Sequence, residues 1–316
     1  MISNTKILVV IPVYNVGEII IDFLDKIPDY VDKIYLIDDC CPMGTGKIAE
    51  NSKANTSKLT IIYNKKNLGV GGAVKVGYEK CLLEDSGIIV KIDGDNQMDP
   101  NQIKKIVDPI ISNKDLDYCK GNRFLEMIEI ENYPSIRFYG NIFLSFMSKL
   151  SSGYWDIYDP VNGFTAINSN ILKKLNFDKI DDGYYFESDM LFNLYLLRAK
   201  VKDIPVKIKY FKNSTQNMNI FYESFNFFFK NLNRVTKRIK KTYLLNNFSV
   251  GSFFIISFII NFLLTATYGG YNYIYHLFIK EFAPTGVVLL SSIFLLLTIL
   301  SLMIFLIIDN FNNPNK

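Results

Sequence analysis

The chain has 316 residues, a formal net charge of +4 and a hydrophobic fraction of 49%, which allows one large domain or two ordinary ones. The charge is modest and the basic residues cluster ahead of an apolar segment, so the composition does not indicate a nucleic-acid-binding protein. The four cysteines and the single His276 show no metal-ligand spacing, which argues against a zinc site and for reduced thiols.

Strands and helices are predicted to alternate through the first third of the chain. The run Lys6–Ile11 is continuously apolar after its first residue and largely β-branched, which predicts a strand covered on both faces rather than a secretion signal. The alternation predicts an α/β fold built from βαβ units, with a Rossmann-like, mainly parallel sheet. Further strands are predicted at residues 31–39, 58–64 and 87–96, and helices at 19–27, 46–53 and 67–85.

Polar residues follow three of these predicted strand ends. Asp38 and Asp39 end the second strand, Asn67 follows the third, and the acidic stretch Asp93–Gln97 follows the fourth. In parallel sheets, ligands bind beyond the carboxyl ends of the strands. We therefore expect these side chains to converge at one edge of the sheet.

The chain from residue 118 to residue 239 has a less regular pattern. Its last segment, Phe221–Ile239, carries apolar residues every three or four positions and basic residues on a separate stripe. Such a basic amphipathic helix is expected to lie in a lipid headgroup layer, and a helix packed on the preceding domain is a compatible alternative. Strands are predicted at 118–124 and 202–211, helices at 135–154 and 184–201, and a strand-turn segment at 159–172.

Two long segments, Thr242–Ile279 and Ala283–Ile308, contain no Asp, Glu, Lys or Arg. Each can supply the ~20 apolar residues that cross a bilayer, and a pair of buried core helices is the alternative. Basic residues ahead of the first span stay on the cytoplasmic side, so both chain ends are predicted to be cytoplasmic, with an outer turn at 269–282. The predicted organisation is a globular domain at 1–215, a juxtamembrane helical region at 216–247, two spans within 248–308 (about 249–268 and 283–308) and a disordered tail at 309–316.

The acidic stretch gathers like charges that repel unless a cation lies between them. Asp93, Asp95 and Gln97 alternate, so in extended backbone they point to one side, and Gly94 allows a tight turn. Their oxygens suit Mg²⁺ or Mn²⁺, which proteins usually hold with one or two carboxylates plus substrate phosphates. A metal held there would neutralise a departing diphosphate. The alternative is a solvated acidic turn.

The glycine-rich run "NLGVGGA" at Asn67–Ala73 invites comparison with a dinucleotide-binding fingerprint. It lacks the G-x-G-x-x-G spacing, and it follows the third predicted strand rather than the first. Dinucleotide binding is therefore not expected.

Four segments together resemble family 2 glycosyltransferases of the GT-A fold. They are "IPVYN" at 11–15, "IDD" at 37–39, "NLGVGGA" at 67–73 and "DGDNQ" at 93–97, and their order and spacing also match. The resemblance implies a GT-A catalytic domain in which Asp93 and Asp95 are the DXD metal-binding pair and Gln97 also reaches the metal. The donor-binding residues that it implies are Pro12, Tyr14, Asn15, Asp39, Asn67, Gly69, Gly72 and Asp93.

Within this family, the chain is similar to the branch of dolichyl-phosphate mannose synthases and bacterial polyprenyl-phosphate glycosyltransferases, over roughly Lys6–Tyr210. The matching elements are DGDxQ, Gly121–Arg123, Arg137 with Gly140 and Asn141, and Asp159 with Gly163 and Phe164. The catalytic residues that this implies are Asp95, Asp159, Arg123 and Arg137, and the implied ligands of an acceptor phosphate are Arg123, Arg137, Lys209 and Ser214.

One departure from the branch concerns its usual Arg and Gly-x-Ser-Lys stretch after the last strand. This chain has "KYFKNSTQN", in which Lys209 or Lys212 stands in for the Arg and Ser214 lies nearby. Arg and Lys are not equivalent in bidentate phosphate binding.

A phosphate acceptor fits the basic residues of the second half. A hydroxyl nucleophile needs a general base, whereas a phosphate monoester is already anionic near neutral pH, with a second pKa of about 6. It needs cations that bind and orient it, and Arg123, Arg137 and Lys209 offer them.

Three carboxylates in the second half have less certain roles. Asp159 could align the acceptor or act as a weak base. Glu187 and Asp189 lie where hydroxyl-glycosylating relatives keep their catalytic acid. Asp189 is interpreted as polar support at a helix start, where the dipole favours a carboxylate, and the role of Glu187 stays open.

The predicted function is an inverting, metal-dependent transfer of a hexose from a UDP- or GDP-linked sugar to polyprenyl (undecaprenyl) phosphate at the cytoplasmic face of the cell membrane. The alternative enzyme is a family 2 glycosyltransferase that acts on a hydroxyl of a glycan or glycolipid. A third reading is a catalytically silent protein that binds a sugar nucleotide or scaffolds a membrane complex. The expected partners are a nucleotide sugar, polyprenyl phosphate and the lipid bilayer, without nucleic acid; the sugar, the base, Mg²⁺ versus Mn²⁺ and homo-oligomerisation are left open.

Overall fold

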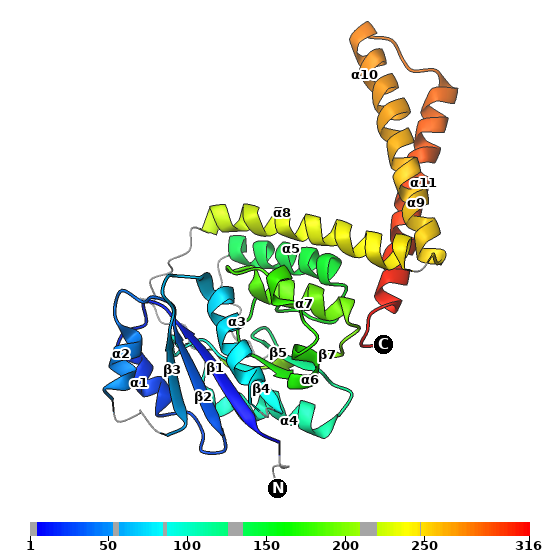
Figure 1. The fold of residues 1–316 in the computed structure, drawn as a ribbon. Coiled ribbons are helices and arrows are strands. Elements are labelled where there is room, and N and C mark those ends of the chain that lie inside the picture. The colour runs from blue at the N-terminus through cyan, green and yellow to red at the C-terminus, as the bar shows by residue number, and fades with distance from the viewer. Residues whose placement is uncertain (1–4, 53–56, 85–86, 126–134, 209–219, 247) are drawn as a thin grey trace. The chain divides into compact units, whose positions relative to one another are not determined.

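The computed structural model of the protein describes residues 5–52, 57–84, 87–125, 135–208, 220–246 and 248–316. The chain forms two compact units. The first comprises Met1–Val235 together with Asn315, and the second comprises Thr236–Pro314 together with Lys316. Figure 1 shows both as a ribbon. The predicted domain boundaries at residues 215, 247 and 308 stay predictions.

The first unit is built on a seven-stranded sheet with the strand order β3-β2-β1-β4-β6-β5-β7. Strand β6 runs antiparallel to its neighbours β4 and β5, and the other neighbouring pairs are parallel. The predicted α/β fold with a mainly parallel sheet is therefore confirmed (Figure 1). The strands are β1 Ile7–Val13, β2 Lys33–Asp38, β3 Leu59–Tyr63, β4 Ile88–Lys91, β5 Tyr118–Asn122, β6 Thr165–Asn168 and β7 Val201–Pro205.

Helices cover the sheet and connect its strands. The α-helices of the first unit are α1 Ile19–Leu24, α2 Thr45–Glu50, α3 Gly69–Leu82, α4 Ile103–Ser112, α5 Ser135–Ser152, α6 Ser169–Leu172, α7 Phe186–Leu196 and the larger part of α8 Ile220–Ile239. Two short 3₁₀ helices are η1 Pro100–Gln102 and η2 Phe177–Lys179.

The inner strand β1 is apolar at every position because both of its faces are covered. Ile7, Val9 and Ile11 belong to a core cluster that includes residues of α1 and α4. Leu8 and Val10 belong to a second cluster that includes residues of α3 and α7. The alternation of side chains along one strand thus divides the core into two layers.

The sequence predictions omit α4. Ile103, Ile106, Val107 and Ile110 are spaced by three and four and are all buried, which is the pattern of an amphipathic helix. Pro109 lies inside this helix and is the residue that argues against it in the sequence, since proline removes one backbone hydrogen bond.

Helix α8 packs against other elements of the first unit, as predicted by the alternative in which the amphipathic helix lies on the preceding domain. Asn231 is buried, and its side-chain oxygen accepts hydrogen bonds from the hydroxyl groups of Ser151 at 2.6 Å and Tyr185 at 3.0 Å. On the same helix, Phe225 and Phe229 are 62% and 60% exposed. The exposed phenylalanines keep the predicted lipid-facing role of the helix open.

The second unit contains two helices that are long and apolar enough to cross a membrane, Val250–Ile279 and Thr285–Phe311. The first is continuous through α9 Val250–Leu264, a π-helical segment Thr265–Gly269 and α10 Gly270–Ile279, and the second is α11 Thr285–Phe311. The predicted outer turn at 269–282 is therefore wrong over most of its length. Lys280 adopts a positive φ of 56° and ends the first helix.

Small polar side chains join α9 and its π-helical extension to α11. The hydroxyl oxygens of Ser257 and Ser301 lie 2.9 Å apart, and those of Thr265 and Thr298 lie 3.3 Å apart. Hydroxyl pairs of this kind hold apolar helices together where hydrophobic contact alone gives little preference.

The predicted disorder of residues 309–316 is wrong for the start of this tail. Residues 309–311 form the end of α11, and Asp309 is fully buried. Its carboxylate oxygens accept from Nη1 and Nη2 of Arg238 at 2.7 and 2.8 Å, and one of them also accepts from the Tyr243 hydroxyl at 2.7 Å. This ion pair orders the C-terminal end of α11 against the π-helical segment Lys240–Leu245 and the residues before it.

Candidate active site

The predicted convergence of strand ends is confirmed by the sheet. Strands β2, β1 and β4 are parallel neighbours, with Val13 beside Asp38 and Val10 beside Lys91 in the register. Their carboxyl ends therefore open at one edge of the sheet, and the segments after them start there.

Asp39, directly after β2, holds the start of α3. Its two carboxylate oxygens accept from the backbone N–H groups of Leu68 and Gly69 at 2.9 to 3.1 Å, and one also accepts from Asn64 Nδ2 at 2.7 Å. A carboxylate at the N-terminal end of a helix is favoured by the helix dipole. Asp39 thus has a structural role, and its predicted contact with the donor nucleoside stays a prediction.

The glycine-rich run that opens α3 lies against another backbone segment. A side chain at Gly69 or Gly71 would place its first carbon 2.6 or 2.5 Å from the carbonyl oxygens of Asp182 and Asp181. The N–H of Gly72 donates to the Asp182 carbonyl at 3.0 Å. Packing against this loop explains why the positions lack side chains, separately from the predicted approach to a diphosphate.

The end of β1 and the residues after it carry three further predicted donor-binding residues. Pro12 is buried in the strand, Tyr14 is 43% exposed, and Asn15 adopts a positive φ of 59°. The Asn15 N–H donates to Cys41 Sγ at 3.1 Å. Burial alone would raise the pKa of the Cys41 thiol, but hydrogen bonds from Thr45 and from backbone N–H groups outweigh it and lower the pKa.

The acidic stretch after β4 includes a charge contact that the sequence analysis missed. Lys91, the last residue of β4, is buried, and its Nζ lies 2.8 Å from Asp93 Oδ1 and 2.7 Å from Glu187 Oε1. Burial alone would lower the pKa of Lys91, but the two carboxylates raise it above its ordinary value. Lys91 therefore stays charged, and it joins the acidic stretch to the first turn of α7.

Asp95 lies at the rim of the loop, where its Oδ1 accepts from the Gln97 N–H at 3.1 Å. Surrounding protein removes part of the water around its carboxyl group, and the nearby charge of Asp93 adds to this effect. Together they raise the pKa of Asp95 to about 6, although the residue remains exposed.

A divalent cation fits this pair of carboxylates. Loss of surrounding water is the larger cause of the raised pKa of Asp95, and repulsion from Asp93 is the smaller one; a bound cation would relieve that repulsion. Within the described part of the chain, no group of three or more His, Cys, Asp or Glu side chains could hold a metal ion. Mg²⁺ and Mn²⁺ are compatible with fewer protein ligands, because substrate phosphates complete their coordination. Asp93, Asp95 and Gln97 can supply the protein's share.

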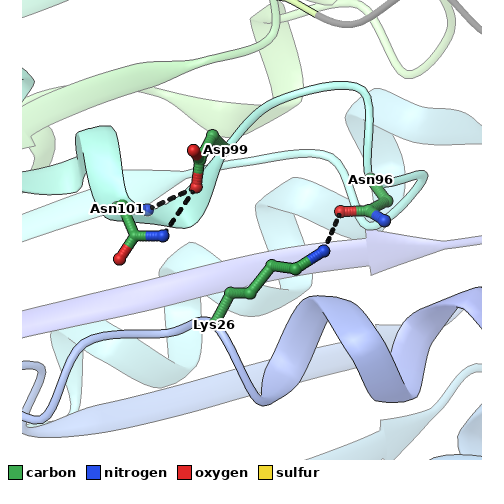
Figure 2. Close-up of a pocket in the computed structure, with 4 residues that line it drawn as sticks. All are labelled: Lys26, Asn96, Asp99 and Asn101. Carbon is green, nitrogen blue, oxygen red and sulfur yellow. Dashed lines mark hydrogen bonds between the residues drawn. The ribbon is translucent and has the colours of Figure 1, made fainter.

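Side chains within the acidic stretch, after it and from the segment that follows α1 hold the shape of its loop. Figure 2 shows a pocket lined by Lys26, Asn96, Asp99 and Asn101. Lys26 Nζ donates to Asn96 Oδ1 at 3.3 Å, and Asn96 adopts a positive φ of 59° at the bend. Asp99 Oδ1 accepts from the Asn101 backbone at 3.0 Å and caps η1. The hydrogen bonds of these side chains therefore stabilise the conformation of the loop.

Arg123 and Asp159 form the clearest arrangement on the predicted acceptor side. Arg123 Nε and Nη2 donate to the two carboxylate oxygens of Asp159 at 2.7 and 2.8 Å, a bidentate geometry. Asp159 is fully buried, whereas the Arg123 side chain is 25% exposed. Asn162 Nδ2 also donates to Asp159 Oδ2 at 3.2 Å. Both oxygens of Asp159 are engaged by Arg123, so this carboxylate orients the guanidinium group.

A second buried lysine, also missed by the sequence analysis, supports the same loop. Lys120 in β5 donates from Nζ to the Asn162 carbonyl at 2.7 Å. Burial lowers its pKa to about 8, against the opposing pull of Glu187 and Asp159. The available signal for Lys91 and Lys120 was a single charged residue within an otherwise uncharged strand.

The two carboxylates in the first turn of α7, Glu187 and Asp189, have different partners in the structure. Asp189 is fully buried and pairs with Arg234 Nε at 2.6 Å, which supports its interpretation as a structural residue. Glu187 is also buried and is held by Lys91.

The other predicted acceptor residues are not described at side-chain level. Lys209, Lys212 and Ser214 lie outside the described residues. Arg137 and Gly140 belong to α5, in the part where only the backbone is described. Their predicted phosphate contacts stay predictions.

The mainly parallel sheet, with polar loops and an acidic pair at its carboxyl edge, is the architecture expected of a GT-A transferase. The profile of Glycosyl transferase family 2 matches residues 8–175, more than half of the chain, so the protein belongs to this family and is a glycosyltransferase. The family resemblance read from the sequence is confirmed.

Two relatives with named activities match about two thirds of the chain. A UDP-N-acetylglucosamine–dolichyl-phosphate N-acetylglucosaminyltransferase of Methanococcus voltae is 28% identical over 221 residues, covering 66% of this chain and 87% of the relative. An undecaprenyl-phosphate mannosyltransferase of Micrococcus luteus is 24% identical over 208 residues, covering 64% of this chain and 82% of the relative.

Solved structures share the fold. Glucosyl-3-phosphoglycerate synthase from Mycobacterium tuberculosis, crystallised with Mn²⁺, uridine diphosphate and phosphoglyceric acid, matches with a TM-score of 0.54 and 16% identity, covering 74% of this chain and 79% of that chain. The same enzyme was also crystallised with Mg²⁺ and uridine diphosphate. At this identity the likeness concerns the fold, and it agrees with the predicted GT-A architecture.

Proposed function

We propose that this glycosyltransferase moves a hexose from a nucleotide sugar to a polyprenyl phosphate, with inversion at the anomeric carbon and with Mg²⁺ or Mn²⁺ at Asp93, Asp95 and Gln97. The names of the relatives from M. voltae and M. luteus support a lipid-phosphate acceptor. The observation that carries the proposal is the bidentate pair between Arg123 and buried Asp159, which presents a fixed, partly exposed cation on the predicted acceptor side.

The chemistry follows from which groups carry charge. An acceptor phosphate oxygen attacks the anomeric carbon, a carbon–oxygen bond forms to the lipid phosphate, and the bond to the nucleoside diphosphate breaks. The phosphate is already anionic near neutral pH, so the step needs orientation more than proton removal. Arg123, held by Asp159, would orient it with Arg137, Lys209 and Ser214 as proposed further ligands. A divalent cation, when bound, would neutralise the leaving diphosphate.

The donor would lie along the carboxyl edge of β1, β2 and β4. Its proposed contacts are Pro12, Tyr14, Asn15, Asp39, Asn67, Gly69, Gly72 and Asp93. The donor is a UDP- or GDP-hexose, since both fit the carboxylate pair through the same diphosphate.

A membrane location is part of the same proposal. A polyprenyl chain leaves the bilayer at a cost of about 0.8 kcal/mol per exposed CH₂, so its phosphate reacts at the headgroups. The two helices that are long and apolar enough to span support a protein that brings its donor site there. We propose that the reaction takes place at the cytoplasmic face, because basic residues beside a span are retained on that side.

A transfer assay tests the acceptor class. Full-length protein in detergent would be incubated with radiolabelled UDP- or GDP-hexoses, MnCl₂ and either undecaprenyl phosphate or undecaprenol. Product that needs the phosphate and releases sugar in mild acid is expected. Product formed equally on the alcohol or on a glycan hydroxyl, and stable to mild acid, would instead support the hydroxyl-acceptor alternative. Asp95→Asn should abolish transfer, and Asp115→Asn, a change at a strongly exposed carboxylate, is its matched control.

A further inference from the structure

Lys91 carries its charge into the middle of the sheet. It ends β4, which lies between β1 and β6, and only 1% of its side chain is exposed. A buried ammonium group is unfavourable unless carboxylates or hydrogen bonds compensate it. Asp93 and Glu187 supply this compensation, and both border the proposed metal site.

The two partners differ in their access to solvent. The Asp93 side chain is 30% exposed and lies in the stretch proposed to hold the metal, whereas Glu187 is 7% exposed and lies in the first turn of α7. Lys91 Nζ bridges them at 2.8 and 2.7 Å. The three ionised groups together carry one net negative charge. The more exposed of the two carboxylates is Asp93, in the acidic stretch.

The loop that follows Asp159 fixes this bridge from one side. A side chain added at Gly163 would place its first carbon 2.1 Å from Asp93 Oδ2 and 2.4 Å from Lys91 Nζ. Such a close approach by backbone leaves little room for Asp93 to rotate. One oxygen of Asp93 is thus held by Lys91, and the other lies against the loop.

We propose that Lys91 is a positioning residue for the metal-binding carboxylate Asp93, and that Glu187 neutralises Lys91 so that Asp93 keeps its affinity for a divalent cation. This inference rests on the proposed function. Without Glu187, the full charge of Lys91 would lie 2.8 Å from Asp93, where it competes for the carboxylate and repels a metal ion. Residues that contact metal ligands influence metal affinity without touching the metal themselves.

The proposal assigns different effects to the two charges. Glu187→Gln should leave Lys91 uncompensated and weaken Mn²⁺ binding by about tenfold or more, because an uncompensated ammonium group beside Asp93 repels the cation. The double variant Lys91→Met with Glu187→Gln removes both charges together. It should recover most of the Mn²⁺ affinity lost in the single variant, while its turnover stays low because Asp93 is no longer held.

The matched control is Asp189→Asn. Asp189 lies in the same first turn of α7 and is also buried and ion-paired, but its partner is Arg234 rather than Lys91. The Asp189→Asn variant loses a comparable buried charge but keeps the contact between Lys91 and Asp93. Its Mn²⁺ affinity should match that of the unmodified protein even if its thermal stability falls.

Mn²⁺ binding would be measured on the full-length protein in detergent from the EPR signal of free Mn²⁺, in titrations with UDP and, separately, with GDP. Thermal unfolding of each variant reports folding. Equal Mn²⁺ affinity in Glu187→Gln and the unmodified protein, or a double variant as weak as the single one, overturns the inference while leaving the proposed function intact. Unmodified protein that transfers sugar in EDTA and binds no Mn²⁺ with either nucleotide overturns the metal-dependent function and the inference with it.

Discussion

Asp203 in β7 should make the stability of the first unit depend on pH. Its Oδ2 accepts from Asn122 Nδ2 at 2.6 Å and from the Tyr158 N–H at 2.8 Å. Its Oδ1 is buried and has no hydrogen-bond partner among the described residues. Burial outweighs both hydrogen bonds and raises the pKa from 3.8 to about 6. The ionised carboxylate is therefore disfavoured in the folded protein.

The size and sign of this effect follow from the pKa difference. A folded-state pKa raised above the unfolded value means that the folded state binds the proton more tightly between about pH 4 and 6. At 1.36 kcal/mol per unit, a shift from 3.8 to about 6 destabilises the folded state by at most about 3 kcal/mol above pH 6, and this cost disappears below pH 4. Stability should thus rise as the pH falls through this window.

Asp203→Asn tests the argument because the amide oxygen can keep both accepted hydrogen bonds without the charge. The thermal midpoint of the variant, relative to the unmodified protein, should fall by several degrees between pH 7.5 and pH 4.5, since about 1 kcal/mol corresponds to roughly 2–4 °C in a domain of this size. Asp115→Asn, at a carboxylate that is 76% exposed, should leave the pH dependence unchanged. Parallel curves for Asp203→Asn and the unmodified protein would refute the assigned cost of burial.

Four further outcomes follow from the structure. Arg123→Lys cannot engage both oxygens of Asp159, so the KM for the lipid phosphate should rise by about tenfold or more with unchanged nucleotide binding; an unaltered KM would contradict the role of the pair. Gly163→Ala introduces a carbon 2.1 Å from a carboxylate oxygen and should lower kcat by about a hundredfold, measured in the transfer assay, and normal turnover would show that the loop can move away. Arg238→Met leaves Asp309 buried without its cation and should cost about 3–5 kcal/mol, measured as a lower thermal midpoint in detergent, whereas replacing both residues with Met should recover much of it; a double variant no more stable than the single one would argue against the pair. EDTA should abolish transfer, and added MnCl₂ should restore it, whereas transfer that persists in EDTA would remove the metal from the mechanism.

The sheet was predictable because its central strands are apolar at consecutive positions. The run before Pro12 fills β1 and supplies both core layers, which is the expected pattern for a strand with helices on both faces. The carboxyl edge followed from the parallel order, since Asp39 follows β2 directly and Asp93 lies two residues after β4. The helix ends were harder to predict, because the first apolar helix continues through Gly269, at the end of its π-helical segment, into α10 at Gly270, where the sequence suggested a turn.

The contacts within the site were not predictable in the same way. Lys91 and Glu187 are 96 positions apart, and neither carries a local pattern that names its partner. The glycines of the run at the start of α3 were assigned to a diphosphate, although Gly69 and Gly71 also lie against the loop at Asp181–Asp182. Motif spacing identifies which residues gather at an edge, whereas burial and charge pairing emerge only when distant segments are packed together.

The choice between a phosphate and a hydroxyl acceptor depends on whether a carboxylate in the site can take a proton. Both oxygens of Asp159 accept from Arg123, and Glu187 Oε1 lies 2.7 Å from the Lys91 ammonium. A base that removes a proton from a hydroxyl must have a lone pair within hydrogen-bond reach of it, and here Arg123 engages both oxygens of Asp159 while Lys91 engages one oxygen of Glu187. A hydroxyl acceptor would therefore compete with Arg123 for Asp159 or with Lys91 for Glu187. A phosphate acceptor requires neither, because it brings its own negative charge to the guanidinium group that Asp159 holds in place.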